Sequence, residues 1–434
     1  MEPITIGITG VAVMVGLLLC GMSVGLSMGL VGYAGIIILA GLTAANSVAA
    51  TVPYDIISDY NFCVLPLFVL MANICFYTRF GQNLFDLTYK WIGRLPGGLA
   101  AATIGSCALF GAVCASIIAT SMTIGLVAIP EMRRYKYDAT LAAACVACGG
   151  ILGILIPPSS VFIIYGIMTE QSIGELFIAG IGPGIVLAIL FILMILIRAR
   201  INPALAPPGP GFTLKEKMGS LLSCIEMFLL ILLSIGGLIA GWFTPTEAGG
   251  IGSLGAIVLS LFRKRLSWGG FKKACAETVL STAMIYLMLI GAMVFNSFLT
   301  LSTLPMELAT MVSALNLPPY AVILMIILLY VILGCFVDAM ALVLLTIPAF
   351  YPVVTSLGYD PIWFGVIIVM VMGMATITPP VGMNVYVIAG IARDVPMGKL
   401  FRATGAFIAV EILFILLLIG FPQIALWLPR FVVH

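Results

Sequence analysis

Charged residues and histidine are both scarce in this chain. Of its 434 residues, 8% are Asp, Glu, Lys or Arg and 62% are hydrophobic, whereas roughly a quarter of the residues in soluble proteins are charged. The mean hydropathy is +1.25. The single histidine is the terminal His434, which excludes histidine-based catalysis and most zinc or haem sites. The composition therefore predicts a protein that crosses a membrane several times.

Signals for processing and for disulfide bonding are also missing. The first apolar run, Ile4 to Cys20, follows no basic segment and has no small-residue cleavage site, so we predict a membrane span and no cleaved signal peptide. The ten cysteines are scattered, mostly within apolar runs, which argues against a disulfide framework. Cys145 and Cys148 have a C-x-x-C spacing, but they lie in an Ala- and Gly-rich span, where we expect them to pack.

Two proline pairs divide the chain into similar halves. Pro157-Pro158 and Pro379-Pro380 lie 222 residues apart, each within a long apolar run. Other residues recur at the same offset: Tyr137-Asp138 with Tyr359-Asp360, Pro130 with Pro352, Ala119 with Ala341, and Leu95-Pro96 with Leu317-Pro318. Because proline removes a backbone hydrogen bond, each pair should break a helix. A duplicated chain with a broken membrane helix in each half is typical of secondary transporters.

The distribution of Lys and Arg predicts how the spans are oriented. The apolar run 98–132 is too long for one crossing, and basic residues flank it from Arg79 to Arg94 and from Arg133 to Lys136. The positive-inside rule places both flanks in the cytoplasm, so we predict a re-entrant helical hairpin with its tip near Cys114 to Thr120. The run 320–356 lies between loops without Lys or Arg, so its hairpin should enter from outside. The prediction is an all-α inverted-topology repeat with both termini periplasmic.

The hairpins and broken helices occupy stretches of the chain that alternate with the remaining spans. We predict scaffold spans in 1–96 and 223–319, and a Pro-rich cytoplasmic linker in 201–222. The two transport segments are 97–200 and 320–434, the second of which includes the last span. At finer detail, we expect 46–60 to lie at a membrane interface, 300–319 to be a connection, and 402–428 to be the last span.

The proline pairs should also leave backbone oxygens free. The affected carbonyls lie near Gly153 and Ile154 in the first half and near Ala375 and Thr376 in the second. A free carbonyl inside a membrane needs an ion, water or protein partner, and several oxygens around one hole suit a sodium ion. The alternative is a kinked helix whose carbonyls are met by Ser or Thr. Two symmetric breaks beside two hairpin tips favour ion or substrate binding.

Asp338 lies at the predicted tip of the second hairpin. It aligns with Ser116 at the 222-residue offset and is the one acidic residue between Tyr320 and Tyr359. A carboxylate at membrane depth usually marks an ion or proton pathway. Because the same apolar stretch holds no basic residue, we expect a sodium ligand; a proton carrier and a structural hydrogen bond are the alternatives.

Polar residues beside the breaks are candidates for substrate contacts. Ser159 and Ser160 follow the first proline pair, and Thr378 and Asn384 flank the second. The helices that begin after the breaks would point their positive N-termini into a cavity, which favours an anion. The same residues suit ordinary N-capping, and both roles are compatible. Glu411 lies in the last span, facing either a polar cavity or a partner subunit.

Several motifs resemble those of a known family. The first half contains Phe110-Gly-Ala, Ile129-Pro-Glu-Met132, Tyr137, Gly153-Ile-Leu-Ile-Pro-Pro-Ser159 and Tyr165-Gly166. The second half contains Gly334, Asp338, Pro348, Pro352 and Thr378-Pro-Pro-Val-Gly-Met-Asn384. Across essentially the whole chain, these motifs resemble the large membrane subunit of tripartite ATP-independent periplasmic (TRAP) transporters. Where that family often has Gly-Ser at the first hairpin tip, this chain has Cys114-Ala-Ser116.

The resemblance implies a sodium-driven, elevator-type importer of an organic-acid anion such as a C4-dicarboxylate or sialic acid. It implies a soluble periplasmic substrate-binding protein and a small four-helix membrane subunit as partners, the latter a separate chain because no extra four-helix region is present here. It also implies the bacterial inner membrane, no enzymatic activity, no organic cofactor and no nucleic-acid partner. We assign sodium binding to Ser116, Gly153, Pro157, Asp338, Ala375, Thr376, Pro379, Gly382 and Met383, and substrate binding to Thr120, Ser159, Ser160, Thr378 and Asn384.

Three other functions were weighed against this prediction. A stand-alone divalent-anion and sodium symporter would have a similar architecture but no binding protein. An intramembrane enzyme would need a nucleophile with its base, or metal ligands, within the spans. A passive channel does not explain two sealed hairpins.

Overall fold

The chain folds into a bundle of helices in two repeats. The computed structural model describes residues 2–78, 80–314 and 317–432, and all regular structure among them is helical. His434 and the predicted cytoplasmic flank at Arg79 lie outside these ranges. The first repeat comprises α1 (Pro3–Leu19), α2 (Val24–Ala40), α3 (Leu42–Ser58), η1 (Tyr60–Cys63), α4 (Val64–Tyr77), α5 (Phe80–Ile92), α6 (Gly98–Cys114), α7 (Ile117–Arg134), α8 (Ala139–Gly149), α9 (Leu152–Leu155), α10 (Ser160–Thr169) and α11 (Ile173–Ile201).

The second repeat follows the connecting helix α12 (Leu214–Ser223). It comprises α13 (Ile225–Ile231), the π-helical turn η2 (Leu232–Gly236), α14 (Gly237–Ile239), α15 (Pro245–Phe262), α16 (Trp268–Leu301), α17 (Leu304–Ala314), α18 (Pro319–Gly334), α19 (Ala339–Ser356), α20 (Pro361–Ala375), α21 (Met383–Ile391) and α22 (Met397–Gly420), with α23 (Gln423–Val432) at the end. Adding 222 to the bounds of the first repeat reproduces the second to within four residues. The duplication therefore extends from the first helix to the last long one.

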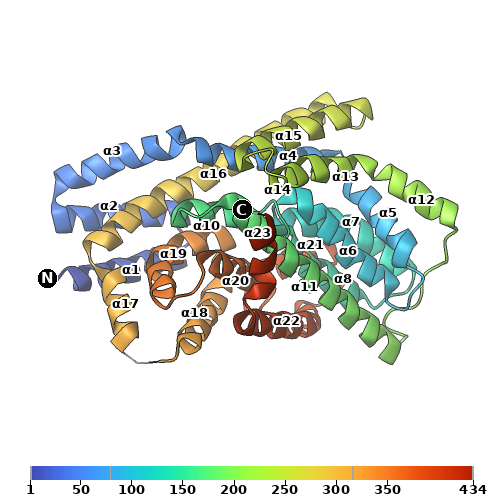
Figure 1. Cartoon of the computed structure of the whole chain (residues 1–434). Helices are drawn as coiled ribbons and strands as arrows, with labels where there is room; N and C mark the ends of the chain where they lie inside the picture. Colours follow the sequence, from blue (N-terminus) through green and yellow to red (C-terminus); the bar gives the residue numbers. More distant parts are fainter. Residues whose placement is uncertain (1, 79, 315–316, 433–434) are drawn as a thin grey trace.

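The packing contacts between the two repeats are reciprocal. Helix α2 packs along α16, and the equivalent helix α15 packs along α4. In the same way, α10 packs on α19 while α21 packs on α7. Figure 1 shows the equivalent helices α5 and α17 at opposite ends of the molecule. Such reciprocal contacts define a pseudo-two-fold relation between the halves.

Both predicted hairpin tips coincide with helix breaks. In the first, α6 ends at Cys114, Ala115 takes a left-handed conformation with φ of 55°, and α7 begins at Ile117. In the second, α18 ends at Gly334 and α19 begins at Ala339. Each pair of helices packs together across its break. Re-entry into the membrane stays a prediction.

Both proline pairs break their helices as predicted. Pro157-Pro158 lies between α9 and α10, and Pro379-Pro380 lies between α20 and α21; both peptide bonds are cis. Because the breaks cut long apolar runs into short pieces, six helices among the described residues are long and apolar enough to cross a membrane, or seven if the bent pair around α12 and α13 counts as one span.

The structure adds helices to stretches that were predicted as an interface, a flank, a connection and a linker. The stretch 46–60 is largely helical, since α3 follows a bend at Gly41 with φ of 85°, and its place at a membrane interface stays a prediction. The connection 300–319 contains α17, and the predicted flank 79–96 contains α5. The linker 201–222 contains most of α12, which Thr213 and Glu216 start with a capping box. The last span ends at Gly420, and Pro422 precedes a separate α23, since proline cannot donate the next helical hydrogen bond.

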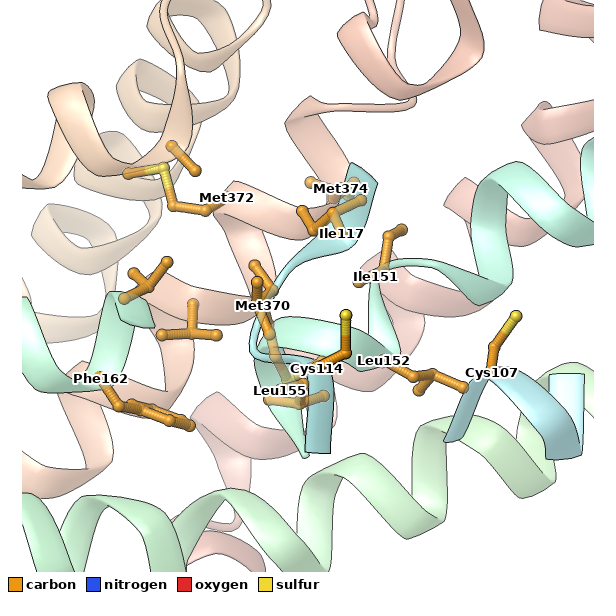
Figure 2. Packing of buried hydrophobic residues seen from close by; sticks show 14 of the residues in the cluster. Cys107, Cys114, Ile117, Ile151, Leu152, Leu155, Phe162, Met370, Met372 and Met374 are labelled. Atoms are coloured by element: carbon orange, nitrogen blue, oxygen red, sulfur yellow. The ribbon is translucent and has the colours of Figure 1, made fainter. Parts of the chain in front are cut away.

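Buried side chains fill the region where the broken elements cross. Helix α9 packs on α6 and α20. Figure 2 shows Cys114 of α6, Leu152 and Leu155 of α9, and Met370 of α20 among these side chains. All four are at most 2% exposed. The short α9 is therefore held by close packing on both of these helices, and this packing fixes the position of the first break.

Candidate functional site

The hairpin tips, the helix breaks and α16 enclose one cavity of about 350 Å³. Its polar and charged lining comes mainly from the broken elements: Ser116, Ser160, Asp338, Thr376 and Asn384, together with Ser281 of α16. Its apolar lining consists of Ala115, Ile117, Ile118, Ile154, Val161, Met284, Ile285, Met288, Ala339, Met340 and Met383. The structure thus joins residues that lie up to 269 positions apart in the sequence.

Four helices begin at this cavity. The first two residues of α7 (Ile117 and Ile118), α10 (Ser160 and Val161), α19 (Ala339 and Met340) and α21 (Met383 and Asn384) all line it. A helix N-terminus carries about half a positive charge, because its first N–H groups have no partner within the helix. The prediction that N-termini face the cavity is confirmed, and it extends to the hairpin helices as well as the broken ones.

N-capping accounts for part of the polar lining. The N–H of Ala119 donates to Ser116 Oγ at 3.4 Å, and the N–H of Met340 donates to Asp338 Oδ2 at 3.1 Å. Ser159 Oγ accepts from the N–H of Phe162 at 3.3 Å; Ser159 is fully buried and does not line the cavity. A cap uses one lone pair, so the second oxygen of Asp338 stays available to a ligand.

The first break leaves oxygens without partners. Pro157 and Pro158 have no N–H, so the carbonyls of Gly153 and Ile154 lack their helical donors, and within the described chain no other donor bonds to them. Thr120 Oγ1 is buried and also has no partner among the described residues. A Cβ added to Gly153 would lie 2.5 Å from that hydroxyl and 2.8 Å from the carbonyl oxygen of Ser116. The close approach of α9 to the hairpin tip therefore requires glycine here.

Asn384 ties the second broken helix to the first repeat. Its Nδ2 donates to Ser121 Oγ on α7 at 2.8 Å and to the carbonyl oxygen of Ala147 on α8 at 2.6 Å. Its Oδ1 is buried and has no partner among the described residues. The side chain is 1% exposed. Asn384 therefore offers a fixed, unpaired oxygen between the two repeats.

The second break differs because its oxygens are largely paired. The hydroxyl of Thr376 donates to the carbonyl of Gly373 at 2.7 Å, and that of Thr378 donates to Met374 O at 2.7 Å. The carbonyl of Thr376 accepts from Asn384 N at 3.0 Å, and that of Ala375 accepts from Thr378 N at 3.2 Å. The two carbonyls that the prolines free are therefore paired by backbone N–H groups, and the threonine hydroxyls bond to the neighbouring carbonyls of Gly373 and Met374. Thr378, Ala375 and the proline pair do not line the cavity.

Other predicted residues occupy positions beside the second break. Gly382 starts α21 in a left-handed conformation with φ of +53°, where a side chain would be strained. The carbonyl of Pro379 accepts from Cys335 Sγ of the second hairpin tip at 3.4 Å. Asp338 is exposed and faces the cavity, so its carboxylate is accessible rather than enclosed.

The oxygens around the cavity suit a hard monovalent cation. Carbonyl, hydroxyl, amide and carboxylate oxygens are the ligands that such ions take. The first break offers neutral oxygens from Gly153, Ile154 and Thr120, whereas the second offers the carboxylate of Asp338. The donor set therefore fits sodium at both breaks, with charge at the second.

Several residues at the site were not predicted from the sequence. They are Ala147, which together with Ser121 of the first hairpin holds Asn384, and the α16 residues Ser281, Met284 and Met288. The α16 residues lie in an unbroken apolar helix without a motif, so tertiary packing alone assigns them. Glu411 is fully buried within the chain, so it does not face a partner subunit, and it does not line this cavity.

A duplicated membrane protein whose broken helices meet at one cavity has the architecture of a secondary transporter. Residues 11–424 match the family described as "Tripartite ATP-independent periplasmic transporter, DctM component". The chain therefore belongs to this family of large TRAP permeases, which confirms the resemblance seen in the motifs.

Individual relatives agree with the family match. The chain is 32% identical to the C4-dicarboxylate TRAP transporter large permease DctM of Pseudomonas aeruginosa, over 87% of this chain and 88% of that protein. It is 32% identical to the sialic acid TRAP large permease SiaM of Vibrio cholerae, over 96% of both. These relatives are permeases, which confirms that the chain is a transport protein and not an enzyme.

Two further comparisons concern the chain's partners and its fold. A 30% identical relative, the isethionate TRAP permease DctMQ of Oleidesulfovibrio alaskensis, is matched over 57% of its length, so a large permease also occurs within a longer chain. Membership of a tripartite system is shown, and a separate small subunit stays a prediction. The YdaH transporter of Alcanivorax borkumensis has the same fold, with a TM-score of 0.60 at 19% identity over 90% of both chains.

Proposed function

We propose that this chain is the large permease of a sodium-coupled importer of an organic-acid anion. In this proposal a periplasmic binding protein delivers the anion, and a small membrane subunit completes the permease in the bacterial inner membrane. The observation that carries the proposal is the convergence of four helix N-termini on a cavity with unpaired oxygens at its edge. The N-termini suit an anion and the oxygens suit a cation, so one site can hold both.

Sodium would bind at the two breaks. At the first, the ligands are the carbonyls near Ser116, Gly153 and Pro157 and the hydroxyl of Thr120. At the second, they are the carboxylate of Asp338 and backbone oxygens between Ala375 and Met383, including those of Thr376, Pro379 and Gly382. Because residues beside both breaks line one cavity, and Asn384 ties the second broken helix to α7 and α8, sodium and anion binding would reinforce each other.

Transport would occur by an elevator motion. The hairpins and broken helices would move as one body against a scaffold that includes α16, carrying the cavity across the membrane. The support is that the cavity lies at the boundary between α16 and the broken elements, with lining residues from both. A static scaffold and a moving body would open such a boundary cavity to each side in turn.

Uptake by proteoliposomes tests this function. The large and small subunits are reconstituted, the cognate binding protein is added outside, and labelled carboxylates are supplied with and without an inward sodium gradient. We expect uptake that requires both the gradient and the binding protein. Uptake that needs sodium but no binding protein would favour the stand-alone symporter, and uptake with neither would refute coupled transport.

A further inference from the structure

The charge of the cavity lining limits the cargo. Of the seventeen lining residues, eleven are apolar, five are polar and uncharged, and one, Asp338, is charged. None of the seventeen is Lys, Arg or His. Arginine and lysine are the side chains that pair most strongly with carboxylates. A carboxylate in this cavity therefore depends on the helix N-termini and hydroxyl groups for its partners.

Those partners lie in one part of the lining. Ser116 accompanies the helix N-termini at the broken elements. The Ser160 hydroxyl and the Asn384 amide also line the cavity there, but their donors already bond to protein oxygens. The wall from α16 contributes Met284, Ile285 and Met288 with one hydroxyl, Ser281. The donors that suit a carboxylate therefore belong to the broken elements, whereas α16 contributes a wall that is apolar except for Ser281.

A second carboxylate would lie in an unfavourable place. Against the α16 wall, where Ile285 is 5% and Met284 is 66% exposed, it would lose part of its water and gain at most the Ser281 hydroxyl. A desolvated charge without partners is costly. An apolar group would instead contact the side chains of Met284, Ile285 and Met288. Methionine is flexible, so this wall adapts to bodies of different shape.

Resting on the proposed function, we infer that this permease takes monocarboxylates with an apolar body in preference to dicarboxylates. The carboxylate lies at the helix N-termini of the broken elements, and the apolar body lies against α16. The cavity, at about 350 Å³, is within the range of small-molecule sites.

Protection of a cysteine introduced at position 281 tests the inference. Ser281→Cys is made in a background without the exposed Cys20 and Cys63. The complex of large and small subunits is used without the binding protein, so that the selectivity of the binding protein does not affect the result. A maleimide labels the new thiol in the presence of sodium, and peptide mass spectrometry reports the modified fraction. Hexanoate and hexanedioate are the probes, because they share a chain length and differ by one carboxylate.

We expect hexanoate to protect the cysteine at a concentration at least about tenfold lower than hexanedioate does. Equal or stronger protection by hexanedioate or by succinate would overturn the inference, as would protection by none of the probes. The proteoliposome assay separates this from the proposed function: sodium-driven uptake that prefers a dicarboxylate would overturn the inference alone, whereas no sodium-driven uptake of any carboxylate would overturn the function.

A substitution in the wall provides a second test. Met288→Arg places a base beside the apolar wall. The concentration of hexanedioate needed for protection, divided by the concentration of hexanoate needed, should therefore fall by about tenfold or more. Leu280→Met is the control, because Leu280 is 65% exposed on the same helix and does not line the cavity. An unchanged ratio in a Met288→Arg protein that elutes as the intact complex would contradict the inference. The titration of the Ser281→Cys protein remains decisive if Met288→Arg does not fold.

Discussion

At the scale of single residues, the two helix breaks have different chemistry. The first has buried neutral oxygens, those of Gly153, Ile154 and Thr120, that lack partners among the described residues. The second pairs its carbonyls with backbone N–H groups and with the hydroxyls of Thr376 and Thr378, and it adds the carboxylate of Asp338. Two equivalent positions in a duplicated fold have thus diverged into a neutral and a charged site.

Asp338→Asn tests the charged site. The change keeps the shape and an oxygen that can accept from the N–H of Met340, but removes the charge that attracts a cation. We expect the sodium concentration for half-maximal uptake to rise at least about tenfold, which is about 1.4 kcal/mol. Glu307→Gln is the matched control, because Glu307 is exposed on α17 and lies outside the cavity. An unchanged sodium response of Asp338→Asn would favour a proton carrier or a structural role.

Thr120→Val tests the neutral site. The substitution removes a buried hydroxyl that has no partner and keeps the side-chain shape, so stability should fall by less than about 1 kcal/mol or should rise. Sodium-driven uptake should nevertheless be strongly reduced if the hydroxyl is a ligand. Thr103→Val is the control, since the Thr103 hydroxyl is buried on α6 and donates to the carbonyl of Leu99 at 2.9 Å. Thermal unfolding and uptake measured together distinguish the roles; normal sodium-driven uptake by Thr120→Val would remove this residue from the site.

At the scale of elements, the reciprocal packing of the repeats explains why the cavity exists. Helix α10 packs on α19 and α21 packs on α7, so the second half of each broken helix contacts the hairpin of the other repeat. Asn384 reinforces one of these contacts through Ser121 and Ala147. The hairpins and broken helices are therefore interlocked, whereas α16 contributes a separate wall.

A reversible cross-link tests whether these interlocked elements move as one body. Cysteines at Ile118 of α7 and Met288 of α16, which both line the cavity, would be joined by a bifunctional thiol reagent. We expect uptake to stop on cross-linking and to return on reduction, because the link fixes the hairpin to α16. The same reagent on Ile118→Cys alone fills the cavity without a link and measures steric blocking. Full cross-linking with normal uptake would refute the elevator motion.

At the scale of the whole molecule, the duplication spans nearly the entire chain. Helix bounds repeat at an offset of 222 residues from α1 to α22. Helix α20 covers the positions of α8 and α9, and α13, η2 and α14 together cover that of α1. Helix α16 covers the positions of α3, η1 and α4 as one unbroken helix, with Ser281 where the first repeat has Asp59 at the end of α3. The unbroken helix is what places Ser281 in the cavity wall.

The orientation of the molecule in the membrane is a separate prediction. Single cysteines at Glu170 and Lys215, both exposed, should differ in their reaction with an impermeant reagent. We expect labelling of position 170 in intact cells and of position 215 after permeabilisation alone, because Lys and Arg cluster in the linker. Labelling of position 215 from outside would refute the inverted orientation of the repeats.

The sequence by itself determined the membrane class, the duplication, the positions of both tips and both proline breaks, and the family. These follow from local properties: hydropathy, the missing N–H of proline, and motifs that recur at a fixed offset. It did not indicate the helices α3, α5 and α17, which occupy stretches predicted as an interface, a flank and a connection; their placement relative to the membrane stays a prediction. Only the tertiary structure showed that Asn384 bonds to α7 and α8, that Thr376 and Thr378 pair with carbonyls, and that α16 forms a wall. The physical reason is that hydrogen-bond partners and cavity walls depend on packing between segments far apart in the chain.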